Sequence, residues 1–519
     1  MSDRLPTSEQ AGSRTSHRWW ILVVVSFAQF MLVLDTTIMN VALPSAQADL
    51  NFTDGQRPWL VTAYALAFGS LLLLGGRLGD RIGRRRTFIG ALVAFGFASA
   101  LGGAAQSFGV LVTARTIQGV AAAMLAPVVL STLITTFTAP HERGRAFGIF
   151  ASVAIGGSAA GLVLGGVLTE YLSWRWVMYV NVLFAVVAGL GAAIFMISDR
   201  PVSRARIDLV GAVLATAGLF SLVFGFSYAE SAGWTSAVTL SSIVLGVALL
   251  VAFAVAERRV AAPLLPPRVV VNRSRAAAFG ALAVSGFAMF GLFLLLTFYL
   301  QTVRGFSPVS SGLAFLPMIA CIMASANLAT MVILPRFGPR AVITTGMTVG
   351  ALAMAYLTRL DVDTSYASGV LPSLILMGVG MGMIVAPSMN TATVGVQPQD
   401  AGVASALVNT MQQIGGSIGT AVLSTIAATA TTAYAADHSS AASGLGAQAA
   451  THGYTVAFAT SAGAFAAGAL LGALLFPTKR RLDQEREEEE AGLDANVAAR
   501  IRATVPASVD STGGVVGLR

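Results

Sequence analysis

Charged residues are scarce in this sequence: Asp, Glu, Lys and Arg make up 11% of its 519 residues, whereas soluble domains carry about 25%. Lysine occurs once, as Lys479, and every other basic residue of the formal charge count is an arginine. Cysteine also occurs once, as Cys321, which excludes an intrachain disulfide. Against these deficits stand 55% hydrophobic residues and a mean hydropathy of +0.75, a composition that indicates a polytopic membrane protein.

The sequence also lacks the features by which an energy source or a reaction centre is recognised. It has no phosphate-binding P-loop, so we do not expect ATP to drive the protein. It shows no pairing of nucleophile and base, so we expect no enzyme activity, and we assign no metal site and no cofactor. The first apolar stretch is too long for the core of a signal peptide and lacks a small-residue cleavage site, so no cleaved leader is expected.

Apolar stretches of about 20 residues, the length that crosses a bilayer as a helix, recur along the chain. The polar segments between them are mostly short, so no soluble domain is inserted. We therefore predict an all-α membrane protein with fourteen transmembrane helices. Their expected ranges are 19–43, 58–78, 87–106, 108–134, 145–170, 175–197, 207–229, 236–256, 276–302, 310–334, 340–358, 369–394, 402–430 and 453–476.

Basic residues mark alternate connections between these stretches. If the N-terminus is inside, most arginines lie on the inner side, and the outer loops hold only Arg57, Arg175, Arg304 and Arg359. Because cytoplasmic loops of membrane proteins carry the excess of positive charge, both termini are expected in the cytoplasm and the helices in the inner (plasma) membrane. The basic residues are scattered rather than gathered in one domain, so we expect no nucleic-acid partner. We expect a monomer.

Two parts of the chain resemble each other. At one constant shift along the sequence, Gly157 aligns with Gly415 and Gly161 with Gly419. Repeated bundles around a midplane site, which rock to open one side at a time, are the plan of many secondary transporters. The predicted division is a tail at 1–18, a six-helix bundle at 19–197, an inserted two-helix hairpin at 198–256, a second six-helix bundle at 257–476 and a tail at 477–519.

One acid and one base stand deep inside apolar stretches. Asp35 lies roughly 24 Å above the inner end of its helix, and Arg115 lies roughly 10 Å below the outer end of its own, at 1.5 Å per residue. The two therefore share a depth, and each lowers the cost of burying the other. Intramembrane charges usually mark ion or substrate paths, so we interpret this pair as a proton-coupling site, with a static structural ion pair as the alternative.

The inner connection between the second and third stretches reads GRLGDRIGRRR, from Gly76 to Arg86. Its glycines permit a tight turn between two helix ends, and its acid has arginines within reach. The spacing resembles the cytoplasmic loop signature of the major facilitator superfamily, which implies a conformational latch between the two halves; a role of the arginines in topology alone is the alternative. The residues assigned to the latch are Gly76, Asp80, Arg81, Gly83, Arg84 and Arg85.

Small residues recur along the fifth stretch. Gly157, Gly161 and Gly165 stand at positions i, i+4 and i+8, a stripe that lets a neighbouring helix approach closely. Plain helix packing explains this spacing by itself. Together with Gly166, the stretch also resembles the antiporter motif of drug/proton exchangers, although the proline usual after the middle glycine is Leu162 here.

The first stretch contains LDTTIMNVALP, from Leu34 to Pro44. With the signatures above, it resembles the fourteen-span drug/proton antiporter family (the EmrB/QacA type) of the major facilitator superfamily, over about residues 19–476. The resemblance implies two six-helix bundles with an inserted hairpin. It also implies multidrug or antibiotic efflux, in which hydrophobic, often cationic or aromatic small molecules leave in exchange for inward protons and Arg115 takes part in proton transfer.

Polar side chains inside apolar stretches are candidates for a substrate cavity, because left unpaired in hydrocarbon each would cost roughly a few kcal/mol. We expect drug and proton to occupy the Asp35 region in a mutually exclusive way while the halves rock. The cavity candidates are Asn40, Tyr64, Gln118, Asn327, Asn409, Gln412 and Gln413.

Two alternatives stay open. One is a symporter or uniporter of the same fold for a metabolite, which the glycine stripe disfavours and Leu162 leaves open. The other is a membrane receptor or enzyme with a transporter-like body, which the missing catalytic constellation disfavours. Within export, a self-resistance exporter and a broad multidrug pump both fit the sequence.

Overall fold

The chain is described here from a computed structural model, in which every regular element of the described residues is a helix. The predicted tails are described only at 8–18 and 477–479, and the start of the predicted hairpin, 198–207, lies outside the described part. The described residues are 8–137, 140–196, 208–260, 263–265, 267–394, 396, 401–438 and 444–479.

Helices dominate because a chain in lipid must satisfy its backbone hydrogen bonds within each segment. Those of the first half are α1 (Ser8–Leu50), the short 3-10 helix η1 (Asp54–Gln56), α2 (Arg57–Ile82), α3 (Arg84–Gly103), α4 (Phe108–Thr136), α5 (Pro140–Tyr171) and α6 (Trp176–Phe195). Next come α7 (Leu209–Ala232), α8 (Ala237–Glu257), the short α9 (Pro267–Val270) and α10 (Arg273–Phe298), which continues as the π-helical η2 (Tyr299–Val303). The last are α11 (Pro308–Ala314), α12 (Leu316–Leu328), η3 (Ala329–Ile333), α13 (Leu334–Leu357), η4 (Tyr366–Val370), α14 (Leu371–Thr393), α15 (Ala401–Asp437) and α16 (Leu445–Leu475).

Twelve helical stretches of the described residues are long and apolar enough to cross a membrane, which makes the chain a multi-pass membrane protein. The prediction of fourteen is not reached by this measure, for two reasons. The stretch Pro308–Leu357 counts once, although Gly338 interrupts its helical backbone with φ 76° and ψ 169°. The helix α2, which carries arginines near both of its ends, is not among the twelve.

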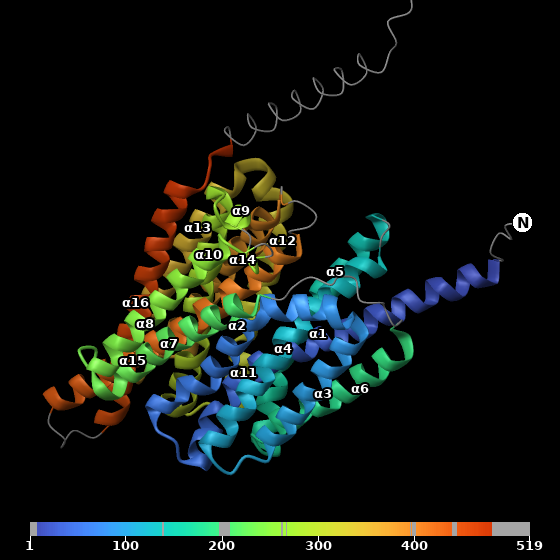
Figure 1. Cartoon of the computed structure of the whole chain (residues 1–519). Helices are drawn as coiled ribbons and strands as arrows, with labels where there is room; N and C mark the ends of the chain where they lie inside the picture. The colour runs from blue at the N-terminus through green and yellow to red at the C-terminus, as the bar shows by residue number, and fades with distance from the viewer. Residues whose placement is uncertain are drawn as a thin grey trace, which may run out of the picture.

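The helices pack in two groups (Figure 1). In the first group α1 packs against α5 and α6, α2 against α4, and α3 against α4 and α6. In the second group α10 packs against α14, α15 and α16, and α13 against α14 and α16. The helices α7 and α8 pack against each other, and α7 also contacts α2 and α15, where the two groups meet. Both ends of the described chain lie on one side of the molecule, called the termini side below.

Glycines that align in the two halves make equivalent contacts. The stripe on α5 lies against the backbone of α1, and its counterpart on α15 lies against the backbone of α10. Each glycine faces a main-chain carbonyl, which a Cβ would approach to 2.9 Å or less at Gly161, Gly415 and Gly419 and to 3.2 Å at Gly157. The contacts are Gly157 with Phe30, Gly161 with Leu34, Gly415 with Ala283 and Gly419 with Phe287. Since α1 and α10 each open one group, these contacts support the predicted internal repeat.

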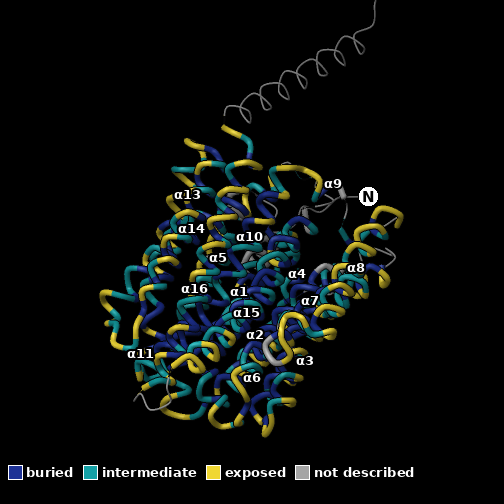
Figure 2. The backbone as a smooth tube through the Cα atoms, turned by 90° about the vertical axis from the view of Figure 1, so that its left-hand side faces the viewer, coloured by how far each residue is buried: buried dark blue, intermediate teal, exposed yellow. Residues whose placement is uncertain are grey.

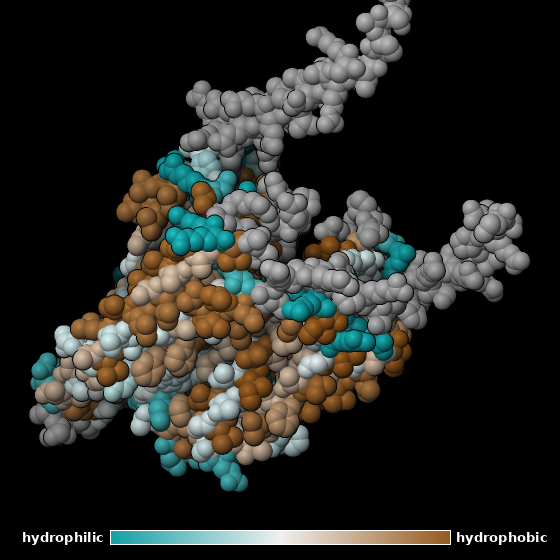
Figure 3. All heavy atoms as spheres, viewed as in Figure 1, coloured by the Kyte–Doolittle hydropathy of each residue, from teal (hydrophilic) through white to brown (hydrophobic). Residues whose placement is uncertain are grey.

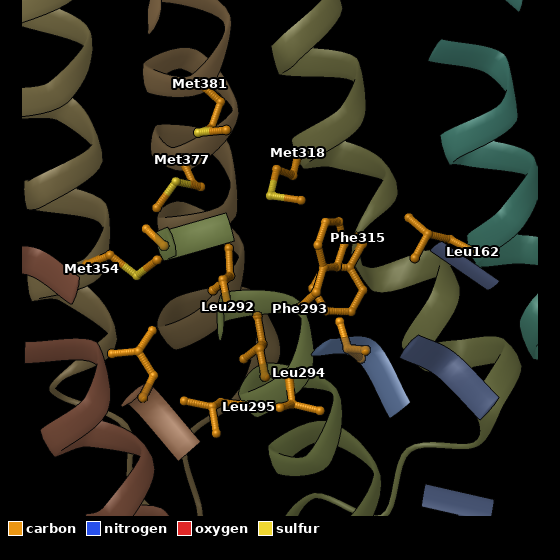
Figure 4. Packing of buried hydrophobic residues seen from close by; sticks show 14 of the residues in the cluster. Leu162, Leu292, Phe293, Leu294, Leu295, Phe315, Met318, Met354, Met377 and Met381 are labelled. Carbon is orange, nitrogen blue, oxygen red and sulfur yellow. The ribbon is translucent and has the colours of Figure 1, made fainter. Parts of the chain in front are cut away.

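The core of the molecule is apolar, and so is much of its outer surface. Buried residues run through the middle of the helix groups (Figure 2), and brown hydrophobic side chains cover the face seen in Figure 3. Large apolar side chains such as Leu190, Ile194 and Val244 are more than half exposed, as expected where lipid rather than water covers a protein. In the core, the ring centroids of Phe293 and Phe315 lie 5.0 Å apart (Figure 4).

Candidate functional site

The carboxylate of Asp35 is enclosed in the middle of α1 and receives three hydrogen bonds from two other helices. Arg115 donates from Nη1 to its Oδ2 at 2.7 Å. Gln118 and Asn181 donate from their side-chain amides to Oδ1, at 3.1 and 2.8 Å. The residue has no exposed surface, and the predicted partnership with Arg115 is confirmed as an ion pair.

The guanidinium of Arg115 is enclosed as fully as the acid. Besides Asp35, it donates from Nε to the main-chain oxygen of Leu60 at 3.1 Å and from Nη1 to Oε1 of Gln118 at 2.9 Å. Its Cζ lies 4.4 Å from the ring centroid of Tyr64, a cation–π distance. Arg115 and Gln118 stand three residues apart on α4, so both side chains point to the same face of that helix.

Burial and pairing together make this site sensitive to the loss of any one member. Removing one partner of a buried ion pair typically costs about 3–5 kcal/mol, because the other charge stays buried without compensation. Here the amide donors satisfy the carboxylate oxygen that Arg115 does not reach. Hydrogen bonds to an ionised carboxylate are stronger than those to a neutral group, so the contact with Arg115 depends on the charge of Asp35.

Two members of the network were not assigned from the sequence. Asn181 of α6 binds Asp35 directly, and the hydroxyl of Ser99 on α3 accepts from Nε2 of Gln118 at 2.8 Å. The signal for Asn181 was a polar amide in an apolar stretch, the same signal that selected Gln118. The serine gives no such signal, because a serine inside a helix often bonds its own backbone, as Ser99 also does toward Phe95.

The predicted antiporter stripe packs against the part of α1 that bears Asp35. A Cβ placed on Gly161 or Gly165 would lie 2.9 Å from the carbonyl oxygens of Leu34 and Ile38, respectively. Real side chains do not approach that closely, so the close approach of the two helices at these positions requires glycine. A displacement of α1 at Asp35 must therefore move α5 as well.

The far end of α5 touches the second helix group on the side opposite the termini. A Cβ on Gly166 would lie 2.6 Å from Cα of Val309 at the start of α11. Close by, Oε2 of Glu170 accepts from the backbone amide of Val309 at 3.0 Å. Gln301 donates from Nε2 to the main-chain oxygen of Val41 at 2.9 Å. Three contacts thus join the two groups here, and Figure 4 shows Leu162 of α5 and Phe315 in the same region.

The predicted latch is a tight connection, and one of its glycines makes the turn. Gly83 adopts φ 100° between α2 and α3, and Gly79 packs against Val128 of α4. Arg84 donates to Oγ1 of Thr135 at 2.9 Å.

The arginines of this connection mostly bind the first helix group. Arg85 donates to the main-chain oxygen of Ala193 at 2.7 Å, and Arg81 is exposed. Arg77 instead binds the main-chain oxygen of Pro263, in the segment that leads to the second group. Gly76 lies near Pro127, and the side chain of Asp80 lies outside the described residues. A latch role stays a prediction.

The structure does not bring the cavity candidates together. Tyr64 and Gln118 belong to the Asp35 network, and Asn40 bonds the main chain of its own helix at Thr36. The candidates of the second group do not bond to that network. Asn327 and Asn409 are exposed, and Gln412 is half-buried. Gln413 is buried near Gly69 of α2, and its amide nitrogen has no partner among the described residues. No group of three or more His, Cys, Asp or Glu within the described ranges is placed to hold a metal ion.

This chain is similar in sequence to a known family and to named proteins of that family. Residues 25–420 match the family model described as Major Facilitator Superfamily. The chain is 47% identical over 471 residues to the puromycin resistance protein pur8 of Streptomyces alboniger, covering 90% of this chain and 93% of that protein. It is 41% identical over 423 residues to the cephamycin export protein CmcT of Amycolatopsis lactamdurans, covering 81% and 87%.

Solved structures of low sequence identity share the fold. The crystal structure of the POT family transporter PepTSo aligns with a TM-score of 0.67 at 13% identity, covering 89% of this chain and 97% of that chain. The crystal structure of a mutant of the nucleoside transporter NupG aligns with a TM-score of 0.62 at 11% identity, covering 89% and 100%.

Proposed function

This chain belongs to the Major Facilitator Superfamily, and on that basis we propose that it exports hydrophobic, antibiotic-like small molecules in exchange for inward protons. Two relatives that cover most of the chain are named for puromycin resistance and for cephamycin export. The single observation that carries proton coupling is the enclosed Asp35–Arg115 pair, since a charge pair at this depth in lipid is costly and marks an ion path.

The proposed architecture is the fourteen-span one of the drug/proton antiporter subfamily. Two features support two spans beyond the twelve stretches: α2 packs along α4 inside the first group, and the break at Gly338 divides Pro308–Leu357. The mutual packing of α7 and α8 supports an inserted hairpin between bundles 19–197 and 257–476. We assign the termini side to the cytoplasm, because an even number of spans puts both termini on one side of the plasma membrane and most arginines lie on that side.

In the proposed mechanism, the drug binds from inside while Asp35 carries its charge, and the outer contact between the two halves then opens. A proton that enters from outside neutralises Asp35, loosens its hold on Arg115 and favours release of the drug. Asp35 has no exposed surface here, so drug and proton exclude each other indirectly, through helix positions. The glycine contacts between α1 and α5 carry the displacement to Gly166 and Glu170, which hold the outer ends of the two halves together. Closing that contact returns the protonated, drug-free protein to the inward-facing state, and release of the proton inward restores the starting state.

The test is drug accumulation in cells that express the protein, with puromycin as the probe. Wild-type cells should accumulate less puromycin than cells without the protein, and a protonophore should abolish the difference. Asp35→Asn should accumulate as much as cells without the protein while reaching the membrane in normal amount. The matched control is Asp437→Asn, an exposed acid at the end of α15, which should export like wild type.

Two outcomes would contradict the proposal. Normal export by Asp35→Asn across a pH gradient would remove the proton role of this residue. Greater accumulation in expressing cells than in control cells would favour the second candidate, a symporter or uniporter of the same fold, which the replacement of the motif proline by Leu162 leaves open.

A further inference from the structure

Two acids that the proposed transport mechanism does not use meet on the termini side of α7 and α8. Asp208 stands immediately before α7 and is 8% exposed, and Glu257 ends α8 and is 4% exposed. One oxygen of each is satisfied by the backbone: Oδ1 of Asp208 accepts from the amide of Gly211 at 2.8 Å, and Oε2 of Glu257 accepts from the amide of Leu265 at 2.8 Å.

The other oxygen of each carboxyl group has no hydrogen-bond donor among the described residues. Oδ2 of Asp208 and Oε1 of Glu257 are both buried without a partner. They lie 2.5 and 2.8 Å from the position that a Cβ would take on Gly211, and the two side chains are within hydrogen-bonding reach of each other. The absence of a side chain at Gly211 is what leaves room for this approach. The two unsatisfied acceptors therefore face each other.

Two adjacent buried carboxyl groups are not expected to be ionised together, because like charges at this distance repel strongly where water is excluded. A single proton placed between them removes the repulsion and supplies the one donor that both oxygens lack. We propose that Asp208 and Glu257 form a second proton-binding site, in which one proton is shared between Oδ2 of Asp208 and Oε1 of Glu257.

Among the residues that the structure describes around this pair, no basic side chain takes the place of that proton. Arg258 and Arg259 follow Glu257 and are exposed, and Arg77 of α2 binds the main-chain oxygen of Pro263. The helix α15, which also packs against α7, carries a single charged residue, Asp437, at its opposite end. Among the described residues, the charged group that acts on Glu257 is Asp208.

The shared proton has a consequence for the segment that joins α8 to the second helix group. Glu257 holds this segment at the Leu265 amide, and Arg77 from the latch region holds it at Pro263. Loss of the proton leaves two charges in contact, which drives Glu257 away from Asp208 and off the Leu265 amide. The site thus fastens the segment to α7 and α8 at low pH and releases it as pH rises.

Carboxamide variants test this directly, because an amide supplies the missing donor permanently. Full-length protein in lipid nanodiscs would be compared as wild type, Glu257→Gln, Asp208→Asn and the exposed-acid control Asp437→Asn. Between about pH 5 and about pH 9, the unfolding temperature of wild type and control should fall as pH rises, whereas that of either amide variant should fall less. The infrared band of a protonated carboxyl group should be weaker in either amide variant than in wild type.

Hydrogen exchange at Leu265 gives a second, local readout. The protection factor of the Leu265 amide in wild type should be compared with that in Glu257→Gln at the same pH. Once the shared proton is lost, the wild-type value should fall by up to about tenfold per pH unit, because release of one proton changes an equilibrium by at most that factor. The same pH dependence in wild type and both amide variants would overturn the proposal. So would stabilisation of wild type by sodium ions at constant pH with no effect of pH, which would make the pair a cation site. Neither result depends on drug export, so failure here is distinguishable from failure of the proposed function.

Discussion

Gly166→Ala is the most informative perturbation of the contact between the two helix groups. A Cβ at this position would lie 2.6 Å from Cα and 2.9 Å from the amide nitrogen of Val309, and 2.7 Å from the carbonyl oxygen of Pro308. Unbonded heavy atoms prefer about 3.5–4.0 Å, so α5 and α11 would have to separate by roughly 1 Å. All three opposing atoms belong to the main chain, and no side-chain rotation can relieve the overlap.

The expected magnitude follows from the cost of overpacking, about 1–3 kcal/mol per misplaced group. In the outward-open state proposed above, the ends of α5 and α11 are apart and the added methyl group meets nothing. The substitution should therefore shift the equilibrium toward the outward-open state by roughly 5- to 150-fold. Gly156→Ala on the same helix is the matched control, because nothing lies within 4 Å of the corresponding Cβ.

The assay is a distance distribution between spin labels on the two helix ends. Cys321 is the chain's one cysteine, so Cys321→Ser gives a clean background for labels at Tyr171, which is 72% exposed, and Ser310. The long-distance population should grow in Gly166→Ala and match wild type in Gly156→Ala. Equal distributions in all three proteins would refute the assignment of this contact as the outer closure.

Three further predictions concern the network and the closure. Arg115→Met should lower the free energy of unfolding by about 3–5 kcal/mol while Asp35 stays charged. It should also abolish proton-dependent puromycin export. Normal export by this variant would show that the ion pair has a purely structural role. Asn181→Ala removes one of the donors to Asp35 and should lower the unfolding free energy by about 1–3 kcal/mol, with no change expected for Thr113→Ala on the exposed face of α4. Glu170→Gln weakens the charge-assisted bond to the first turn of α11 and should raise the long-distance population of the same labels severalfold; no change would remove Glu170 from the closure.

The sequence alone was sufficient to predict contacts that depend on the position of a residue along its helix. Asp35 and Arg115 were paired because residue counting placed them at one level, and the ion pair is present. The glycine stripe was recognised from its helical spacing, and the alignment of Gly161 with Gly419 anticipated their equivalent contacts. Both arguments need only the rise of a helix and the positions of residues along it.

The sequence was insufficient to predict which neighbours a side chain faces, because that depends on how each helix is rotated about its axis. Tyr64 and Gln118 were grouped with Asn409 as cavity candidates, but they turn into the first helix group, whereas Asn409 is exposed. Whether a polar group in an apolar stretch faces a cavity or a neighbouring helix is set by this rotation. The meeting of Asp208 with Glu257 was likewise not predicted: the two ends of a helical hairpin lie side by side, but the rotation of each helix decides which side chains face each other.

Among the described residues, the side chains that bond to Asp35 all come from positions up to 181, and none comes from the helices beyond α6. If Asp35 couples transport to protons as proposed, the residues that bind the proton lie in one half of the protein. In that case the other half is free to vary for different substrates without changing proton binding, as long as its contact with α5 is kept. Such a separation would produce related exporters that share the same proton-binding half and transport different substrates.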